Sequence, residues 1–178
     1  MGTHKRLWPA RYYRGLTKRQ ISARKKEIKK FGSMHWRDPK AYIGFKTDTV
    51  KSVTDRRKRK SNYTLQWDRL FGKKSAKKGT PARTLKQRSA VTGVPLKYID
   101  TVFRRGSAAW RTGHRPGQTP QSWSYPRVSS FLLCGKAHYT ADADQVRLAR
   151  ATSASAKKWF KRCGLFYNEV KKKSAKNS

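Results

Sequence analysis

Hydrophobic residues in this chain fall into short segments with helical spacing, separated by glycine, proline and long basic stretches. The first segment predicts a helix over residues 17–31. Thr17 is its expected N-cap, Gln20 takes the capping-box position, and Gly32 ends it. The apolar stripe of this helix is thin and consists of Leu16, Ile21, Ile28 and Phe31. Because so narrow a stripe stabilises a helix poorly, we expect the helix to dock on another surface, whether of this chain or of a partner.

A second short helix is predicted from its N-cap Ser61 to Phe71, with Gly72 as its end. Between the two helices, residues 33–60 show neither a helical nor a strand period. This stretch ends in a run of five basic residues, Arg56, Arg57, Lys58, Arg59 and Lys60. Such a run is typical of a solvated linker or a nuclear import signal, and equally of a contact with phosphate or an acidic surface.

A pair of helices around Gly93 is the clearest pattern in the second half of the chain. Thr80 and Pro81 predict the start of a helix over residues 81–92, and Val94-Pro95 restarts a second helix with one apolar face. This spacing is typical of a helix-turn-helix. If the pair read DNA, early residues of the second helix would face the groove, namely Lys97, Tyr98 and Thr101. A glycine turn is also common in ordinary helical hairpins, so both interpretations stay open.

Further helices are predicted toward the C-terminus. Residues 128–134 continue a helix that follows the central loop and stops at Gly135, and a last helix lies near residues 155–162. Between them, Asp142 and Asp144 fall in the first turn of another helix. Carboxylates in a first turn complement the helix dipole, and we favour this role over catalysis.

These elements predict a mostly α fold with three regions. Residues 1–79 form a long, largely irregular basic arm with two short helices. Residues 80–168 form a small helical domain that contains the helix-turn-helix-like pair. Residues 169–178 form a basic C-terminal tail.

Charge narrows the choice of partners. Lys and Arg number 45 against 9 Asp and Glu, which gives a formal net charge of +36. Such a chain repels itself when free and requires polyanions or acidic protein surfaces as partners. No run approaches eighteen apolar residues, so we expect no membrane span.

The two cysteines, Cys134 and Cys163, are too few for a disulfide framework, which favours a reducing compartment. Cys134 and His138 could be drawn as part of a metal site, but Cys163 is distant in the sequence. No CxxC pair exists and a fourth ligand is missing, so we expect neither a metal nor another cofactor.

The central stretch of residues 104–135 carries the most specific sequence. Glycine and proline recur every few residues between large aromatic residues, so the stretch defines one loop geometry between two helices. The expected structural residues of this loop are Trp110, Gly113, His114, Pro116, Gly117 and Trp123. We expect both tryptophans to be largely buried. Arg115 and His114 could bind an anion between the two glycines, but we favour the alternative that they cap helix carbonyls.

At this stretch the chain resembles a known family. GSAAWRTGHRPGQTPQSW, the following RVSSFLLCGK and the later TADAD are similar to segments of an uncharacterised family of small basic proteins. The family, with the signature GxAAWxTGHRPGxTPQxW, is encoded by large double-stranded DNA viruses of algae and protists and has relatives in tailed phages. YYRGLTKRQISARKKEIKK, DPKAY, FKTD and SNYTLQW extend the resemblance into the first half of the chain. The resemblance implies a viral protein and supplies no characterised activity.

Charge and resemblance together predict a structural, non-enzymatic virion component. We expect a minor capsid protein on the inner side of the capsid, which bridges major and minor capsid proteins through its basic arms. Packaged DNA is a further candidate partner. During assembly it would occupy the host cytoplasm or nucleus. The alternative is a nucleic-acid-binding protein, either genome-condensing or regulatory. Besides the basic run of residues 56–60, the expected contact residues are Lys97, Thr101, Arg111 and Arg115.

Overall fold

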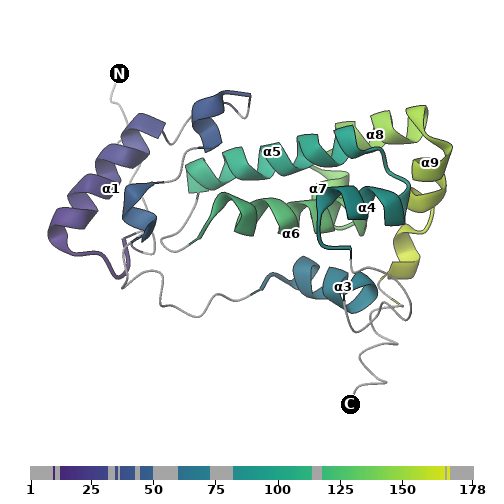
Figure 1. The fold of residues 1–178 in the computed structure, drawn as a ribbon, viewed down its shortest axis with the longest axis horizontal. Helices are drawn as coiled ribbons and strands as arrows, with labels where there is room; N and C mark the ends of the chain where they lie inside the picture. The colour runs from purple at the N-terminus through teal and green to yellow at the C-terminus, as the bar shows by residue number, and fades with distance from the viewer. Residues whose placement is uncertain are drawn as a thin grey trace, which may run out of the picture. The chain divides into compact units, whose positions relative to one another are not determined.

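The computed structural model describes residues 10, 13–31, 35, 37–42, 45–49, 60–72, 82–113, 118–166 and 168. Over these residues the structure consists of helices and turns without a strand, so the prediction of a mostly α fold is confirmed (Figure 1). The helices are α1 (Lys18–Phe31), η2 (Pro39–Tyr42), η3 (Lys46–Thr49), α3 (Asn62–Phe71), α4 (Leu85–Thr92), α5 (Leu96–Gly113), α6 (Pro120–Leu132), α7 (Lys136–Tyr139), α8 (Ala143–Thr152) and α9 (Ala154–Phe160).

The chain divides into two compact units. Unit 1 comprises Met1–Arg59 and Ser107–Trp123, and unit 2 comprises Lys60–Gly106 and Ser124–Ser178. The end of α5 and the start of α6 therefore belong to unit 1, and the rest of both helices belongs to unit 2. The predicted domain boundary between residues 79 and 80 stays a prediction, but α3, which we placed in the arm, lies in unit 2.

In unit 1, α1 begins as predicted. The Thr17 amide donates to Gln20 Oε1 at 2.8 Å, and the Gln20 amide donates to Thr17 Oγ1 at 3.3 Å, which makes the capping box. The helix docks through polar groups as well as through Ile28: the Arg24 guanidinium donates to Asp48 Oδ1 at 2.7 Å. The partner surface that α1 was expected to need therefore includes η3 of the same unit.

In unit 2, α3 packs into the hydrophobic core. Trp67 is buried, and its indole N–H donates to the Ala82 carbonyl at 2.8 Å. Phe71 extends this contact to Trp159, with ring centroids 5.9 Å apart. The buried members of the core are Trp67, Leu70, Ala82, Val94, Tyr98, Ile99, Val102, Val128, Phe131, Leu132, Leu133, Val146, Ala149, Ala156, Trp159, Phe160 and Phe166.

The turn between α4 and α5 has the predicted form. Gly93 lies in the left-handed region at φ 68°, where a side chain would be strained, and α5 begins three residues later. The predicted start of the first helix at residue 81 is wrong by four residues. α4 begins at Leu85 because Thr84 and Gln87 form a complete capping box there.

Boundaries in the C-terminal half also differ from the prediction. α6 begins at Pro120, continues past Pro126 and ends at Leu132, two residues before the predicted end. α7 is a single turn that the sequence did not predict. Cys134, between these two helices, adopts a positive φ of 56°.

The parts of α5 and α6 in unit 2 lie side by side (Figure 1). The Phe103 and Tyr125 rings meet edge to face with centroids 5.2 Å apart. The approach is closest at Gly106, where an added Cβ would lie 2.7 Å from Ser124 Cα. Only a glycine allows the two helices to come this near.

We therefore predict that Gly106→Ala destabilises the protein by about 1 to 3 kcal/mol through overpacking. Helix propensity alone would make the alanine variant more stable by about 1 kcal/mol. A decrease in the free energy of unfolding therefore shows that the two helices are too close to accept the added methyl group. The free energy of unfolding is measured by chemical denaturation. Gly164→Ala is the control, since an added Cβ there meets nothing within 4 Å. Equal stability of the two variants would contradict the close approach.

Candidate functional site

The acidic residues of this protein bind other parts of the chain. Of the nine in the sequence, Asp55 and Glu169 lie outside the described residues, and each of the other seven has a partner. Five pair with a basic side chain: Asp48 with Arg24, Asp68 with Lys60, Asp100 with Arg104, Asp142 with Arg105 and Arg127, and Asp144 with Arg105. Glu27 and Asp38 accept backbone amides of Lys46 and Lys40. These contacts leave a large excess of basic side chains at the surface.

Four of these side chains form what we call the Asp142 network in unit 2. Asp142 is fully buried and accepts Arg127 Nε at 2.7 Å, Arg127 Nη2 at 2.9 Å and Arg105 Nη1 at 3.3 Å. Arg105 also binds both carboxylate oxygens of Asp144, at 2.7 and 2.6 Å. The network joins α5 and α6 to the start of α8.

The network gives Asp142 a role that the sequence did not predict. We expected Asp142 in the first turn of a helix, where it would complement the helix dipole. It lies one position earlier, at the N-cap of α8, and its carboxylate binds the two arginines instead of making a capping hydrogen bond. Asp144 does lie in the first turn of α8. The hydrogen bonds from Arg105 hold the pKa of Asp144 far below its usual value, so this carboxylate remains charged in acid.

A one-sided basic surface lies on α1. Arg24 and Ile28 face inward, whereas six basic side chains are exposed. We call these six the basic face of α1: Lys18, Arg19, Lys25, Lys26, Lys29 and Lys30. At 3.6 residues per turn they fall within an arc of about 140°, so they point to the same side of the helix.

In unit 2, α8 and α9 pack against each other and expose further basic side chains. These are Arg147, Arg150, Lys157 and Lys158, and the exposed Lys161 and Arg162 follow directly after α9. Asp144 is the one acidic residue between residues 143 and 166, and it is held by Arg105. The sequence indicated the charge of this region but not its exposure on two packed helices.

The helix-turn-helix-like pair presents a weaker basic surface. Lys97 is exposed, and Thr101 is half-buried with its hydroxyl donating to the Lys97 carbonyl at 2.9 Å. Tyr98, which would face the groove if the pair read DNA, is buried, and its hydroxyl lies 2.7 Å from the Thr152 hydroxyl. On the same helix, Arg104 forms an ion pair with Asp100. The exposed side of α5 is therefore mixed in charge.

Much of the predicted central loop lies outside the described residues. This applies to His114, Arg115, Pro116 and Gly117, and also to residues 56–59 of the basic run. The backbone of Arg111 and Gly113 belongs to the end of α5. Lys60 is exposed and binds Asp68 at 2.9 Å.

The two tryptophans of the loop differ. Trp110 is buried as predicted, with its indole N–H donating to the Gln118 carbonyl at 3.0 Å and its ring 5.5 Å from Phe45. Trp123 is only half-buried, so the expectation of two largely buried tryptophans holds for Trp110 alone. Because 65 positions separate Phe45 from Trp110, this contact could not be predicted from the sequence.

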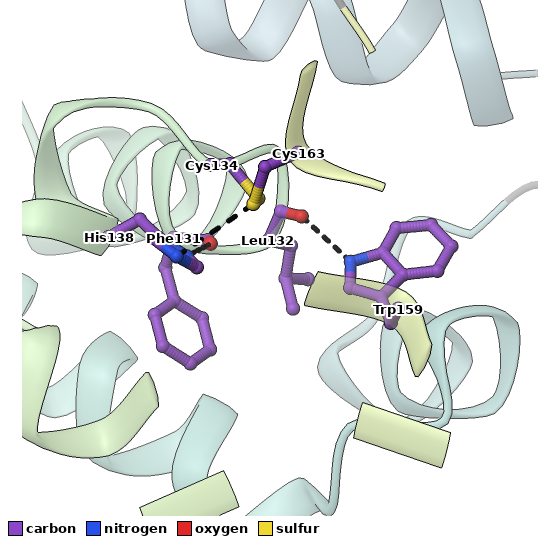
Figure 2. Close-up of a disulfide and its surroundings, with 6 residues drawn as sticks. All are labelled: Phe131, Leu132, Cys134, His138, Trp159 and Cys163. Atoms are coloured by element: carbon purple, nitrogen blue, oxygen red, sulfur yellow. Dashed lines mark hydrogen bonds between the residues drawn. A yellow bond between two sulfur atoms is a disulfide. The ribbon is translucent and has the colours of Figure 1, made fainter. Parts of the chain in front are cut away.

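A second group of chemically active side chains gathers in unit 2. A disulfide joins Cys134 and Cys163, a pairing that we did not predict, and His138 lies beside it (Figure 2). We call these three residues the Cys–His cluster. We separated Cys163 from the other two residues because it is distant in the sequence, but the three side chains lie close together in the structure. Burial lowers the pKa of His138 below its usual value, so the imidazole is neutral at pH 7.

None of the helices in the described part of the chain has the length and apolar character needed to cross a membrane.

Comparison with known proteins places the chain in one family. No curated protein and no solved structure matches it. A model described as a family of unknown function, DUF5824, matches residues 9–148. The match covers most of the 178 residues and includes α1, α3 to α7 and the Asp142 network. The chain therefore belongs to this family of unknown function, DUF5824.

Proposed function

We propose that this protein is a structural, non-enzymatic component of the particle of a large icosahedral double-stranded DNA virus. It acts as a minor capsid protein on the inner side of the shell and bridges acidic surfaces of other capsid proteins. It reaches that position from the host cytoplasm or nucleus, where particles assemble. The viral assignment rests on the sequence signature around Trp110, and the structural role rests on the distribution of charge.

The observation that carries the proposal is the internal use of acidic side chains. The seven described acids bind neighbours within the chain, while the basic face of α1 and the basic side chains of α8 and α9 are exposed. Exposed cations that have few acids among them attract polyanions and acidic proteins. A protein that joins acidic surfaces needs basic surfaces on more than one element, and both units carry one.

A nucleic-acid-binding role is the second candidate, and the turn at Gly93 supports it. Gly93 adopts the left-handed conformation between two helices that a helix-turn-helix would need, but Tyr98 is buried and the exposed side of α5 pairs Arg104 with Asp100. This surface favours binding without sequence preference over the reading of a specific site. Packaged DNA is then a partner through its phosphates.

The capsid role is tested on particles purified from infected cells by density gradient. We expect the protein in the particle fraction, and crosslinking mass spectrometry should join lysines of α1 and α9 to acidic segments of capsid proteins. Abundance in the infected-cell lysate with absence from the particles would reject the capsid role and favour the nucleic-acid-binding role. Crosslinks to capsid proteins that avoid both basic surfaces would reject the bridging mechanism.

We predict that binding to duplex DNA depends steeply on salt and is insensitive to sequence. Each phosphate contact contributes about 0.9 to the slope of log affinity against log salt. The double variant Lys26→Gln/Lys29→Gln should therefore lower the slope by about 1.8, since glutamine preserves helix propensity. Binding is measured by fluorescence anisotropy over a salt series.

The control for this experiment is Arg104→Gln, which removes a charge that already binds Asp100 at 2.8 Å. We expect it to leave the salt slope unchanged. An equal decrease per charge in both proteins would show that net charge, and not the basic face of α1, determines binding. A site bound about a thousandfold more tightly than random DNA would instead establish specific reading.

A further inference from the structure

The Cys–His cluster brings together three side chains that the chain keeps apart. Cys134 follows α6, His138 lies in α7, and Cys163 follows α9. One ligand atom from each residue lies within 4.8 Å of the other two. Figure 2 shows the imidazole directed toward the sulfur atoms. Two sulfurs and one imidazole nitrogen are the donor set that proteins use for zinc.

The hydrogen bonding of His138 prepares its other nitrogen for a ligand. His138 Nδ1 lies 3.2 Å from the Phe131 carbonyl, which can only accept, so Nδ1 carries the proton. In the neutral ring, Nε2 then holds a lone pair, and Nε2 faces Cys163 Sγ at 3.8 Å. An imidazole whose far nitrogen donates to a backbone carbonyl is the usual arrangement of a metal-bound histidine.

Packing holds the ring in this orientation. The Phe160 ring lies edge-on to His138 with centroids 5.0 Å apart, and the Tyr139 ring lies 4.7 Å away. Nearby, the Trp159 indole N–H donates to the Leu132 carbonyl at 2.8 Å, which fixes the end of α6 against α9. These contacts hold the imidazole and the segments next to it in addition to the bond between the sulfurs.

We propose that the reduced protein binds one Zn²⁺ ion through Cys134 Sγ, Cys163 Sγ and His138 Nε2. Two external thiols first reduce the disulfide, and they leave as one disulfide while the protein gains two thiol groups. Zn²⁺ then displaces the two thiol protons and binds both thiolates. A water molecule takes the fourth position, as in other zinc sites with three protein ligands. Oxidation of the two cysteines and zinc binding exclude each other, because each uses both sulfurs.

The distances in the cluster suit this ion. With Zn–S bonds of about 2.3 Å and a Zn–N bond of about 2.0 Å, tetrahedral geometry places a sulfur and a nitrogen ligand about 3.6 Å apart. The observed distance between His138 Nε2 and Cys163 Sγ is 3.8 Å. The same geometry places two sulfur ligands about 3.8 Å apart, so zinc binding requires the sulfurs to separate after reduction. A change of side-chain torsion can supply this movement.

The test uses the full-length protein, reduced with a phosphine under argon and mixed with Zn²⁺. Unbound metal is removed by gel filtration, and zinc per chain is measured by mass spectrometry. We expect one equivalent in the reduced protein and none in the oxidised protein. With Co²⁺ in place of Zn²⁺, the reduced protein should show thiolate-to-metal charge-transfer absorption.

Variants separate this site from adventitious binding. Cys163→Ser and His138→Ala should each abolish stoichiometric zinc binding, whereas His35→Ala, which changes an exposed histidine of unit 1, should retain it. If either cluster variant fails to fold by circular dichroism, alkylation of the reduced wild-type protein gives the same answer, because zinc should protect both cysteines. Zinc content equal in the reduced and oxidised proteins, or cysteines that zinc does not protect, would overturn the proposal.

Discussion

Replacing Trp110 by alanine is expected to destabilise unit 1 by about 3 to 5 kcal/mol, the usual cost of deleting a large buried aromatic side chain. Trp110 is 1% exposed, and its ring packs on Phe45. The same Phe45 ring also contacts α1, because the Arg24 guanidinium lies over it, 5.3 Å from the ring centroid. Loss of the indole therefore removes the apolar support of the residues that dock α1.

The measurement is chemical denaturation followed by near-ultraviolet circular dichroism, which reports the packing of aromatic rings. Trp123→Ala is the matched control, because Trp123 is half-buried in the same unit and should cost less. Trp110→Ala should also lose the helix signal of α1 at a lower denaturant concentration than the wild-type protein does. Equal costs for the two tryptophans would contradict the central position of Trp110.

Replacing Asp142 by asparagine is expected to destabilise unit 2 by about 3 to 5 kcal/mol, as the removal of one partner from a buried ion pair does. Asparagine preserves the volume of the side chain, but it cannot accept both hydrogen bonds from Arg127 that Asp142 accepts. Two guanidinium groups would then remain side by side without the carboxylate that separates their charges. The expected result is a lower free energy of unfolding and loosened packing between α6 and α8.

Asp144→Asn is the control for this experiment. The Asp144 side chain is 39% exposed, so water can replace part of its interaction with Arg105, and the expected cost is about 1 kcal/mol or less. Both variants are compared by thermal denaturation at neutral pH. A cost at Asp142 no greater than the cost at Asp144 would contradict a structural role for the buried carboxylate.

Arginines divide into two groups in this protein. Arg24, Arg105 and Arg127 bind carboxylates. Arg88 is buried between aromatic rings, 4.5 Å from the Trp67 centroid and 5.1 Å from that of Tyr125, and donates to Ser129 Oγ at 2.8 Å. Its burial lowers the pKa of the guanidinium to about 10, but the group stays charged at neutral pH. Most of the other basic side chains that the structure describes are exposed.

Helical elements could be predicted from the sequence where the local signal was strong. The capping box of Thr17 and Gln20 and the glycine turn at Gly93 depend on neighbouring residues, and the structure confirms both. Predictions of where a helix starts were less accurate when more than one residue could act as the N-cap. Both Thr80 and Thr84 could cap the helix before Gly93, and only Thr84 is followed three residues later by a glutamine.

The candidate sites depended on contacts between distant residues. Acidic residues at positions 142 and 144 suggest a helix start, because nothing near them in the chain indicates arginines. The structure brings Arg105 and Arg127 to Asp142 from two other helices. Likewise, 29 positions separate Cys134 from Cys163, and no sequence spacing predicts that they meet.

The sequence by itself determined the helical class, the large positive charge and the family of this protein, because periodicity, composition and a specific signature are local or additive properties. The tertiary structure alone decided which charges are used inside the protein and which face outward. It also decided that Trp110 meets Phe45 and that His138 meets two cysteines. These contacts arise when helices pack and bury their apolar faces, and the free energy of that packing depends on the whole core and not on any one segment.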